Sequence, residues 1–286
     1  MDPAVKPQDD VFIMNIRFRK MNGAGNDFVV FDARQAPLVL SAAQLRDIAS
    51  RDNAITKGCD QVIVMEQPPV NGHRSPATVF MRIFNADGGE VEACGNATRC
   101  IAWLMMRETG TKQVAVQTKA GKLSCVNAGP MQVTADMGAP DLDWHAVANS
   151  PAEEVGMLGV PVLVSMGNPH AVFFVDEVQG VDIARLGPLI ENHPVFPNRV
   201  NVSVAQVRDA THIDARVWER GVGLTQACGT AACATAVAAI ERGECKRGEE
   251  IAVNQGSESL LIRWGANGHV FLTGPVALEF EGVVAL

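Results

Sequence analysis

The sequence predicts an α+β (α/β) fold built from two similar domains that face each other across a cleft. Three observations lead to this prediction. Short strand patterns outnumber helical ones, one segment recurs about half a chain later, and each copy runs from a strand through a glycine-containing loop into a helix. The 286 residues are enough for one large domain or for two of about 140 residues each.

The internal repeat is the strongest sign of two domains. Aligning Cys228 on Cys94 places residues 215–236 over residues 81–102 without a gap, and Ala-Cys-Gly occurs in both. Two upstream segments correspond in the same order. They are Gly25-Asn26 with Gly167-Asn168, and Gln61 with Asn201. A single short window can match by chance, but three windows in the same order rarely do.

The first domain is predicted over residues 14–138, after an N-terminal extension over residues 1–13. A helix over residues 38–51 has Ser41 as its N-cap, and another over residues 96–108 ends near Gly110. Strands are expected over residues 15–21, 28–33, 62–66 and 77–85, followed by several short ones within 113–137.

The second domain is predicted over residues 139–273, after a Gly-Pro-containing boundary at residues 137–140. Helices are expected over residues 181–193 and 230–242, the latter stopped by Gly243. The predicted strands cover residues 167–176 (with a turn), 201–207, 213–220, 251–255, 260–264 and 269–274. A last strand over residues 274–286 is expected to join the first domain.

Composition excludes several classes of protein. The formal net charge of −8 disfavours nucleic acid as a partner, because phosphate binding needs a basic face. The two long uncharged stretches, residues 155–175 and 221–240, indicate core segments rather than membrane spans. Seven cysteines without a secretory signal predict free thiols in a reducing cytoplasm. The absence of tyrosine excludes racemases that use a tyrosine–lysine pair around pyridoxal.

The repeated motif places a cysteine at the N-terminus of a helix in each half. Unpaired N–H groups and the helix dipole lower a thiol pKa there, and the same groups can hold a carboxylate. With Cys94 and Cys228 on opposite sides of a small carboxylate, one thiolate can remove a proton while the opposite thiol returns one. The sequence therefore indicates a two-base racemase or epimerase. A single Ala-Cys-Gly is more often structural, but two equivalent copies reverse those odds.

Other chemistries find less support. The spacing of the cysteines and histidines matches no zinc motif, so no metal site is expected. There is no P-loop and no nucleophile elbow, and the glycines at 23–25 are followed by a strand rather than a helix, unlike a dinucleotide loop. No lysine has a setting that indicates a pyridoxal Schiff base, and no cofactor is expected. The other cysteines are interpreted as packing thiols; they are Cys59, Cys100, Cys125, Cys233 and Cys245.

Several ordered motifs resemble the diaminopimelate epimerase family from about residue 14 to residue 286. They are MNGAGNDF, GCDQ, FNADGGEVEACGN, GNPH, VN and WERGVGLTQACGT. The resemblance implies two pseudo-symmetric domains, each a curved sheet around a helix. It also implies pyridoxal-independent interconversion of LL- and meso-2,6-diaminopimelate, a step toward lysine and peptidoglycan precursors.

The resemblance also assigns roles to matching positions. Cys94 and Cys228 correspond to the catalytic thiol/thiolate pair, and His170 and Glu219 to groups that tune the pKa values of these thiols. The backbones of Gly95-Asn96 and Gly229-Thr230 would hold the reacting carboxylate, and Asn26, Gln61 and Asn168 would line the same pocket. The positions assigned to the non-reacting amino-acid end are Asn85, Asn201, Glu219 and Arg220.

Two alternatives remain open from the sequence. A proline or hydroxyproline epimerase of the same fold would have no use for Glu219 and Arg220 together, because its substrate lacks a second amino-acid end. A thiol redox sensor would need a nearby resolving thiol but no carboxylate pocket. A homodimer, and the choice of which cysteine is the thiolate at rest, stay open as well.

Overall fold

The computed structural model describes residues 14–69, 78–151 and 154–286, so the predicted extension over residues 1–13 lies outside it. The α-helices are α1 Ala42–Ala49, α2 Gly95–Thr109, α3 Ile183–Glu191 and α4 Gly229–Glu241. The strands of the first half are β1 Asn15–Gly23, β2 Asn26–Asp32, β3 Gln61–Glu66, β4 Val79–Asn85, β5 Glu90–Val91, β6 Gln113–Thr118, β7 Gly121–Gly129 and β8 Gln132–Asp136. Those that follow are β9 Val162–Ser165, β10 Pro169–Phe174, β11 Asn201–Asp209, β12 His212–Glu219, β13 Gly223–Thr225, β14 Glu250–Gln255, β15 Glu258–Trp264, β16 Val270–Pro275 and β17 Ala277–Ala285.

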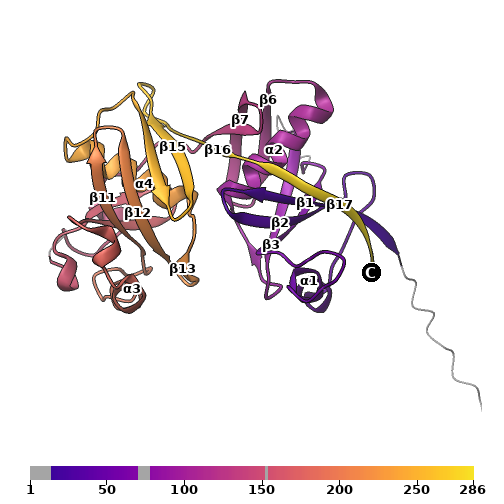
Figure 1. Cartoon of the computed structure of the whole chain (residues 1–286), viewed down its shortest axis with the longest axis horizontal. Coiled ribbons are helices and arrows are strands. Elements are labelled where there is room, and N and C mark those ends of the chain that lie inside the picture. Colours follow the sequence, from indigo (N-terminus) through magenta and orange to yellow (C-terminus); the bar gives the residue numbers. More distant parts are fainter. Residues whose placement is uncertain (1–13, 70–77, 152–153) are drawn as a thin grey trace, which may run out of the picture.

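Strand pairing repeats between the halves. From the centre outward, the first half runs β8-β7-β6-β4-β3-β2-β1, and the second runs β16-β15-β14-β12-β11-β10-β9. The parallel pairs also correspond. The pair β2–β3 in the first half matches β10–β11 in the second, and β4–β6 matches β12–β14. The architecture is therefore α+β with two pseudo-symmetric domains, as Figure 1 shows.

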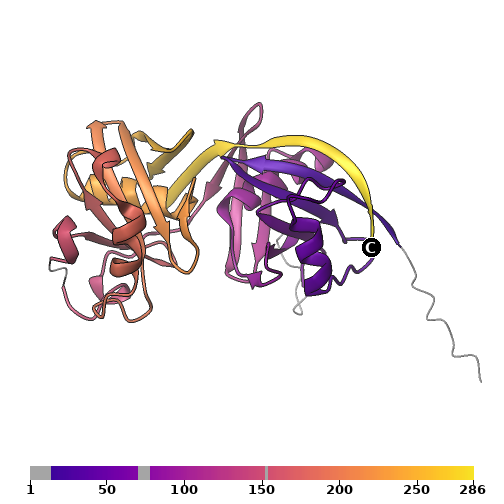
Figure 2. The same ribbon diagram turned by 60° about the horizontal axis from the view of Figure 1, so that its bottom comes forward.

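The two halves join through an antiparallel pair, β8 with β16. Thr134 lies opposite Thr273 in this pair, and their hydroxyl oxygens are 2.6 Å apart. Because β8 and β16 occupy corresponding places in the two halves, the pseudo-twofold axis passes close to this contact. The chain then returns to the first half, where β17 pairs antiparallel with β1, and Figures 1 and 2 show this yellow ribbon passing over it.

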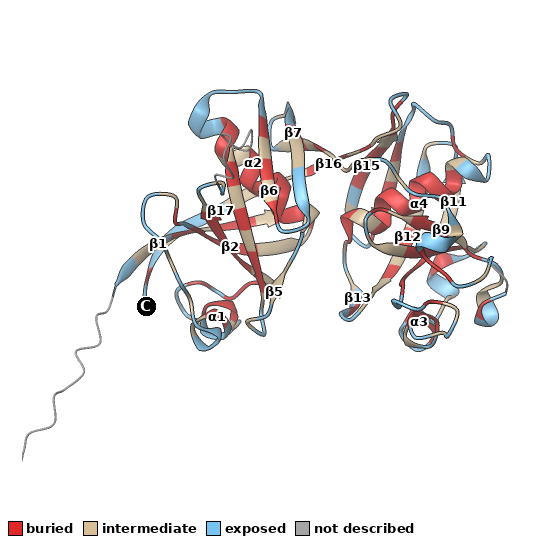
Figure 3. Cartoon of the chain, turned by 180° about the vertical axis from the view of Figure 1, so that it is seen from behind, coloured by how far each residue is buried: buried red, intermediate tan, exposed pale blue. Residues whose placement is uncertain are grey.

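Each half wraps its sheet around one helix and packs a second helix outside. Helix α2 lies against β1, β6, β7 and β8, whereas α4 lies against β9, β10, β11, β14 and β15. Helix α4 is buried on nearly all sides (Figure 3), which its alanine-rich sequence permits because the short side chains let strands approach closely. The outer helices α1 and α3 cover separate apolar clusters.

All four predicted helices are present, within a few residues of their predicted ends. Ser41 caps α1 with a full capping box, and α2 ends at Gly110 with a left-handed φ of 68°. The predicted turn before the second strand is shorter than expected. It consists of Ala24 and Gly25, both at positive φ, because β1 continues to Gly23 and β2 begins at Asn26. The short strands β5, β9 and β13 were not anticipated.

Candidate active site

Cys94 is the N-cap residue of α2, at the point where the loop after β5 enters the helix. Its Sγ accepts a hydrogen bond from the backbone N–H of Ala97 at 3.5 Å, and its thiol donates to Asn26 Oδ1 at 3.9 Å. The helix begins here because an extended residue precedes the first turn and its sulfur takes the place of the usual capping oxygen. One thiol thus lies against a helix N-terminus, as the sequence predicts.

Cys228 is the N-cap residue of α4 and occupies the corresponding place in the second half. Its backbone N–H donates to Gln255 Oε1 at 2.7 Å, and its Sγ lies 3.5 Å from Thr230 Oγ1. The Cys228 thiol also donates to the carboxylate of Glu219, which ends β12. Cys228 therefore has a potential proton acceptor beside it, whereas Cys94 faces a neutral amide.

The two helix N-termini meet at the junction of the halves. A Cβ placed on Gly229 would lie 4.0 Å from Asn96 Oδ1, so the first turns of α4 and α2 are neighbours. The carboxylate of Glu219 acts electrostatically on Cys94 as well as on Cys228. Both cysteines, one from each half, therefore lie within electrostatic range of a single carboxylate.

The pKa values of both thiols are raised, so the predicted lowering at helix N-termini is wrong. Burial raises the pKa of Cys94 to about 11, and the negative charge of Glu219 adds to this rise. Burial and the same carboxylate raise the pKa of Cys228 well above its ordinary value. The backbone N–H groups of the first turns pull both pKa values down, but desolvation outweighs them. Both residues are thiols at neutral pH.

A chain of polar side chains leads from Cys228 to His170. Asn168 Nδ2 donates to Thr230 Oγ1 at 3.3 Å, and Asn168 Oδ1 lies 3.0 Å from His170 Nε2. Because an amide oxygen only accepts, His170 carries its proton on Nε2. Burial, with a contribution from Arg220, lowers the pKa of His170 to about 3. His170 is therefore neutral at pH 7 and reaches Cys228 only through Asn168 and Thr230.

Asn26 is held by a residue that the sequence analysis did not identify. Its Nδ2 donates to Asp60 Oδ2 at 3.1 Å, which leaves Oδ1 facing Cys94. Asp60 also accepts from the backbone N–H of Asp27 and pairs with Arg51. The position of Asp60 within the GCDQ motif is the only signal that could have identified it. Asp60 orients the Asn26 amide by accepting its N–H.

Each half has an equivalent pair of cross-strand neighbours among the predicted site residues. Gln61 lies opposite Asn85, and Gln61 Nε2 donates to Asn85 Oδ1 at 2.9 Å, while Gln61 Oε1 is buried and has no partner. Asn201 stands beside Glu219 at the corresponding ends of β11 and β12. Asn201 donates to Pro169 O at 2.9 Å and accepts from the backbone N–H of Arg220 at 3.0 Å, so both ends of its amide are used.

The side chains of Glu219 and Arg220 diverge. Arg220 Nη1 donates to Asn198 O at 3.0 Å, whereas the Glu219 carboxylate accepts from Thr225 and Cys228. No ion pair joins Glu219 to Arg220 in the part of the chain that the structure describes. The structure thus gathers Glu219 with the cysteines and leaves Arg220 beside the loop that precedes β11.

The remaining cysteines fit the packing role predicted for them, since all five are buried free thiols; they are Cys59, Cys100, Cys125, Cys233 and Cys245. Among the described residues, no group of three histidine, cysteine or carboxylate side chains is placed to hold a metal ion. No helix in the described ranges is long and apolar enough to span a membrane.

A family model described as "Diaminopimelate epimerase" matches residues 18–142 and 162–279, which cover most of both halves. The chain belongs to the diaminopimelate epimerase family. The diaminopimelate epimerase of Rhodospirillum centenum is 48% identical over 274 residues, covering 93% of this chain and 91% of the relative. That of Phenylobacterium zucineum is 46% identical over 276 residues, covering 93% and 96%.

Solved structures with the same fold extend beyond the diaminopimelate epimerase family. A hydroxyproline epimerase from Agrobacterium vitis and a probable proline racemase from Agrobacterium radiobacter each superpose with a TM-score of 0.64 at 16% identity. Each match covers 95% of this chain and 93% of the solved chain. At this identity the likeness shows the fold alone, and the family assignment depends on the closer relatives. As a member of the diaminopimelate epimerase family, the chain is an isomerase.

Proposed function

We propose that this chain interconverts LL-2,6-diaminopimelate and meso-2,6-diaminopimelate without pyridoxal, in the synthesis of lysine and peptidoglycan precursors. One observation carries the proposal: Cys94 and Cys228 occupy equivalent helix N-termini in the two halves, and the charge of Glu219 acts on both thiols. The substrate lies between the thiols, with its reacting carboxylate on the N–H groups of Gly95-Asn96 and Gly229-Thr230.

The reaction begins with a proton moving from the Cys228 thiol to Glu219, to which that thiol already donates. Burial raises the pKa of Glu219, which makes this carboxylate a better base than an exposed one. The Cys228 thiolate then removes the α-proton, so that the C–H bond breaks, an S–H bond forms and the electron pair spreads onto the carboxylate. Cys94 delivers its own proton to the opposite face and is left as a thiolate. Glu219 then releases its proton to solvent and Cys94 takes one up, which restores both thiols and the carboxylate.

Two helix N-termini stabilise the carbanion. Negative charge grows on the reacting carboxylate as the proton leaves, and the first turns of α2 and α4 direct N–H groups toward the junction where it would lie. Gln61 Oε1, buried and without a partner, is available to accept a hydrogen bond from a substrate ammonium group. We assign Asn26, Asn168, Asn85 and Asn201 to the lining of the pocket, and Arg220 to the distal carboxylate.

The raised thiol pKa values also separate this proposal from the redox-sensor alternative. A sensor needs a thiolate at neutral pH, because the thiolate is the species that oxidants attack. Cys94 and Cys228 are both neutral there. A proton-transfer role is compatible with this, since the base Glu219 removes the proton only when the reaction needs it.

The proposal extends to the organisation of the chain. We assign residues 14–138 with 274–286 to the first domain and residues 139–273 to the second, supported by the pairing of β17 with β1. A cytoplasmic location is proposed from the free buried thiols. Among the described residues β17 pairs only with β1, so its outer edge is open to a second copy, and light scattering tests for a homodimer.

The test is incubation with LL-diaminopimelate in deuterated water. We expect meso-diaminopimelate to form and deuterium to enter at one α-carbon, without added cofactor. Proline and alanine serve as control substrates and should not exchange, because neither has a distal amino-acid end. Efficient exchange of proline, with none of diaminopimelate, would overturn the proposal in favour of a proline-type racemase.

A further inference from the structure

Arg99 is a fully buried arginine in α2 that the proposed reaction does not use. Its Nη2 donates to Asn96 Oδ1 at 2.8 Å and its Nη1 to Gly95 O at 3.5 Å, while Nε is buried without a partner. No carboxylate pairs with it in the described part of the chain. Removing a charge from water without an opposite charge beside it is costly, so a guanidinium in this setting needs an explanation.

Arg99 lies at the junction of the two halves. A Cβ placed on Gly274 of β16 would come within 2.9 Å of both Cζ and Nε of Arg99, and within 2.7 Å of a methyl carbon of Leu260 in β15. The guanidinium is thus packed against Gly274 of β16, a strand in the second half of the sheet order. Glycine at position 274 leaves the room that this packing requires.

The internal repeat is asymmetric at this position. With Cys228 aligned on Cys94, Arg99 aligns with Cys233 of α4, so one half carries a cation where the other carries a thiol. The two equivalent positions face each other closely enough to interact electrostatically. At this pair of equivalent positions, the first half therefore carries a permanent positive charge and the second half does not.

The groups that act on Arg99 are neutral, so they do not balance its positive charge. The thiols that act on it come from α2, β7 and α4, and their raised pKa values keep them neutral at pH 7; they are Cys94, Cys100, Cys125 and Cys233. The carboxylates of the surroundings act on these thiols instead: Glu219 on Cys94, Asp136 on Cys125 and Glu279 on Cys100. The positive ends of α2 and α4 add to the positive potential at this place.

We propose that Arg99 is a positioning residue that fixes Asn96 and the first turn of α2, and that it supplies the buried positive charge balanced by the substrate carboxylate and the Cys94 thiolate. This inference rests on the proposed function for the identity of the carboxylate. An anion at the two helix N-termini completes the charge balance of the junction. The same charge lowers the free energy of each anionic state through which Cys94 passes.

The experiment measures how fast Cys94 is alkylated by iodoacetamide at pH 8, because only the thiolate reacts. A Cys228→Ala background removes the other site thiol, and the remaining cysteines are buried. Three substitutions separate charge from hydrogen bonding. Arg99→Lys keeps the charge, Arg99→Gln keeps a donor without the charge, and Arg99→Met keeps neither. Mass spectrometry of the Cys94 peptide reports the rate.

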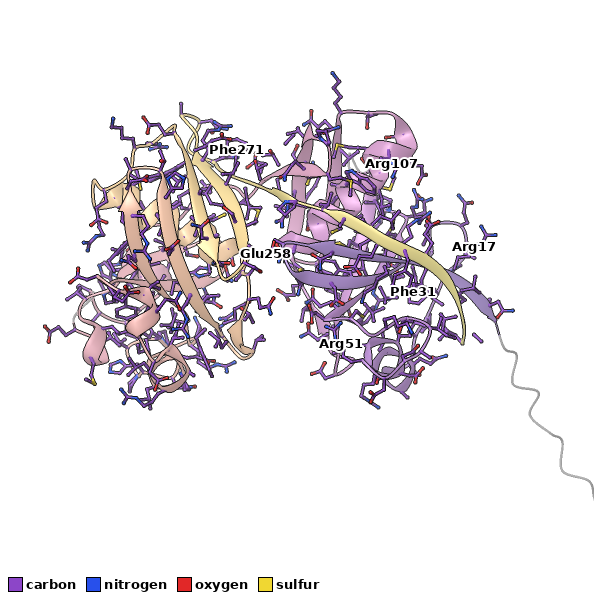
Figure 4. All side chains as sticks on the ribbon, viewed as in Figure 1. Arg17, Phe31, Arg51, Arg107, Glu258 and Phe271 are labelled. Carbon is purple, nitrogen blue, oxygen red and sulfur yellow. The ribbon has the colours of Figure 1, made fainter. Side chains whose placement is uncertain are left out.

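We expect alkylation to be about 3- to 30-fold slower in Arg99→Met and Arg99→Gln, since loss of a nearby cation raises the thiol pKa. Arg99→Lys should stay within about twofold of the parent. The matched control is Arg107→Met, which removes an exposed charge from the same helix, on the side of the first half away from the junction (Figure 4). It should leave the rate unchanged.

A second readout is the pH profile of kcat/KM for diaminopimelate with Cys228 intact. The alkaline limb, which reports Cys94 as the proton donor, should move to higher pH in the two uncharged variants and should be restored in Arg99→Lys. Equal alkylation rates in all three variants would overturn the inference, and so would failure of both uncharged variants to fold. The alkylation rate can be measured without substrate. If the parent chain has no epimerase activity but the variants keep the expected order of rates, the proposed function is contradicted and the role of Arg99 is not.

Discussion

Glu219 interacts with the cysteine of each half of the site. It accepts a hydrogen bond from the Cys228 thiol and, by its charge, raises the pKa of Cys94 in the other half. The sequence places Glu219 beside Arg220, and the family resemblance assigns both to the non-reacting end of the substrate. The structure separates them, because adjacent residues at the end of a strand point to opposite faces of the sheet. Side-chain direction at a strand end depends on where the strand stops, which a sequence pattern gives only to within a few residues.

Replacing Glu219 should change two observables in opposite directions. In Glu219→Gln the base beside Cys228 is lost, and we expect kcat to fall by about 100-fold or more. The negative charge that raises the pKa of Cys94 is lost as well, so alkylation of Cys94 at pH 8 should become faster. Steady-state kinetics and mass spectrometry measure the two effects. Slower alkylation together with lower kcat would indicate general damage to the site instead.

The cysteine pair allows a direct comparison among thiols of the same chain. Cys94→Ala and Cys228→Ala should each abolish epimerisation, because each face of the α-carbon needs its own proton donor or acceptor. Cys125→Ala and Cys245→Ala should retain activity, since these thiols are buried away from the helix N-termini. Substantial epimerisation by either of the first two variants would refute the two-thiol mechanism.

The repeat in the sequence predicted Cys94 and Cys228, but it contained no sign of Asp60. The cysteines are recognisable because the same residue precedes a helix twice. The role of Asp60, just before β3, depends on one hydrogen bond to Asn26 at the start of β2, and only its place in the GCDQ motif hinted at it. His170 shows the same limit, because its neutral state follows from complete burial rather than from its neighbours in the chain.

At the scale of elements, the helices were the most predictable part of the fold. Capping residues and glycines bound α1 and α2, and these signals are local. The two- to four-residue strands β5, β9 and β13 were missed because so short a segment shows no clear alternation. Their positions are set by pairing with β4, β10 and β12, which is a property of the folded sheet.

The end of β1 supports the first turn of α2. A Cβ on Gly23 would lie 2.9 Å from Asn96 O and 3.1 Å from Cys100 Sγ, so only glycine allows this approach. We expect Gly23→Ala to displace the first turn of α2 and lower kcat at least about tenfold, because small misplacements of reacting groups are costly. Gly180→Ala is the matched control, since its Cβ would have ordinary contacts. Unchanged kinetics in Gly23→Ala would show that the turn tolerates the shift.

For the whole molecule, the buried thiols make stability dependent on pH. Burial raises the pKa of Cys59 to about 11 and those of Cys100, Cys125 and Cys233 to about 12, from an ordinary value of 9.0. A folded-state pKa above the unfolded one means that the contribution is complete below pH 9 and is lost as pH rises through the folded value. The fold should therefore weaken in alkali.

We expect the free energy of unfolding to fall by about 1 kcal/mol per buried thiol for each pH unit above 9. Urea titrations at pH 8, 9 and 10 measure this slope. A Cys125→Ala/Cys233→Ala variant should show a shallower fall, although its stability at pH 8 is lower because of the space left behind. A slope that does not depend on the number of buried thiols would assign the alkaline loss to other groups.

The pairing of β17 with β1 has a consequence for how the protein is made. Domains of nascent chains usually fold in the order in which the ribosome releases them. Here the sheet that begins first is completed last, because the strand that covers β1 is translated after every strand of the second half. Until then β1 presents an open edge, ready to pair with whatever strand comes near. During synthesis, the second domain is therefore the first whose sheet can be completed. The edge of β1 stays open to wrong pairing until β17 has been made and pairs with it.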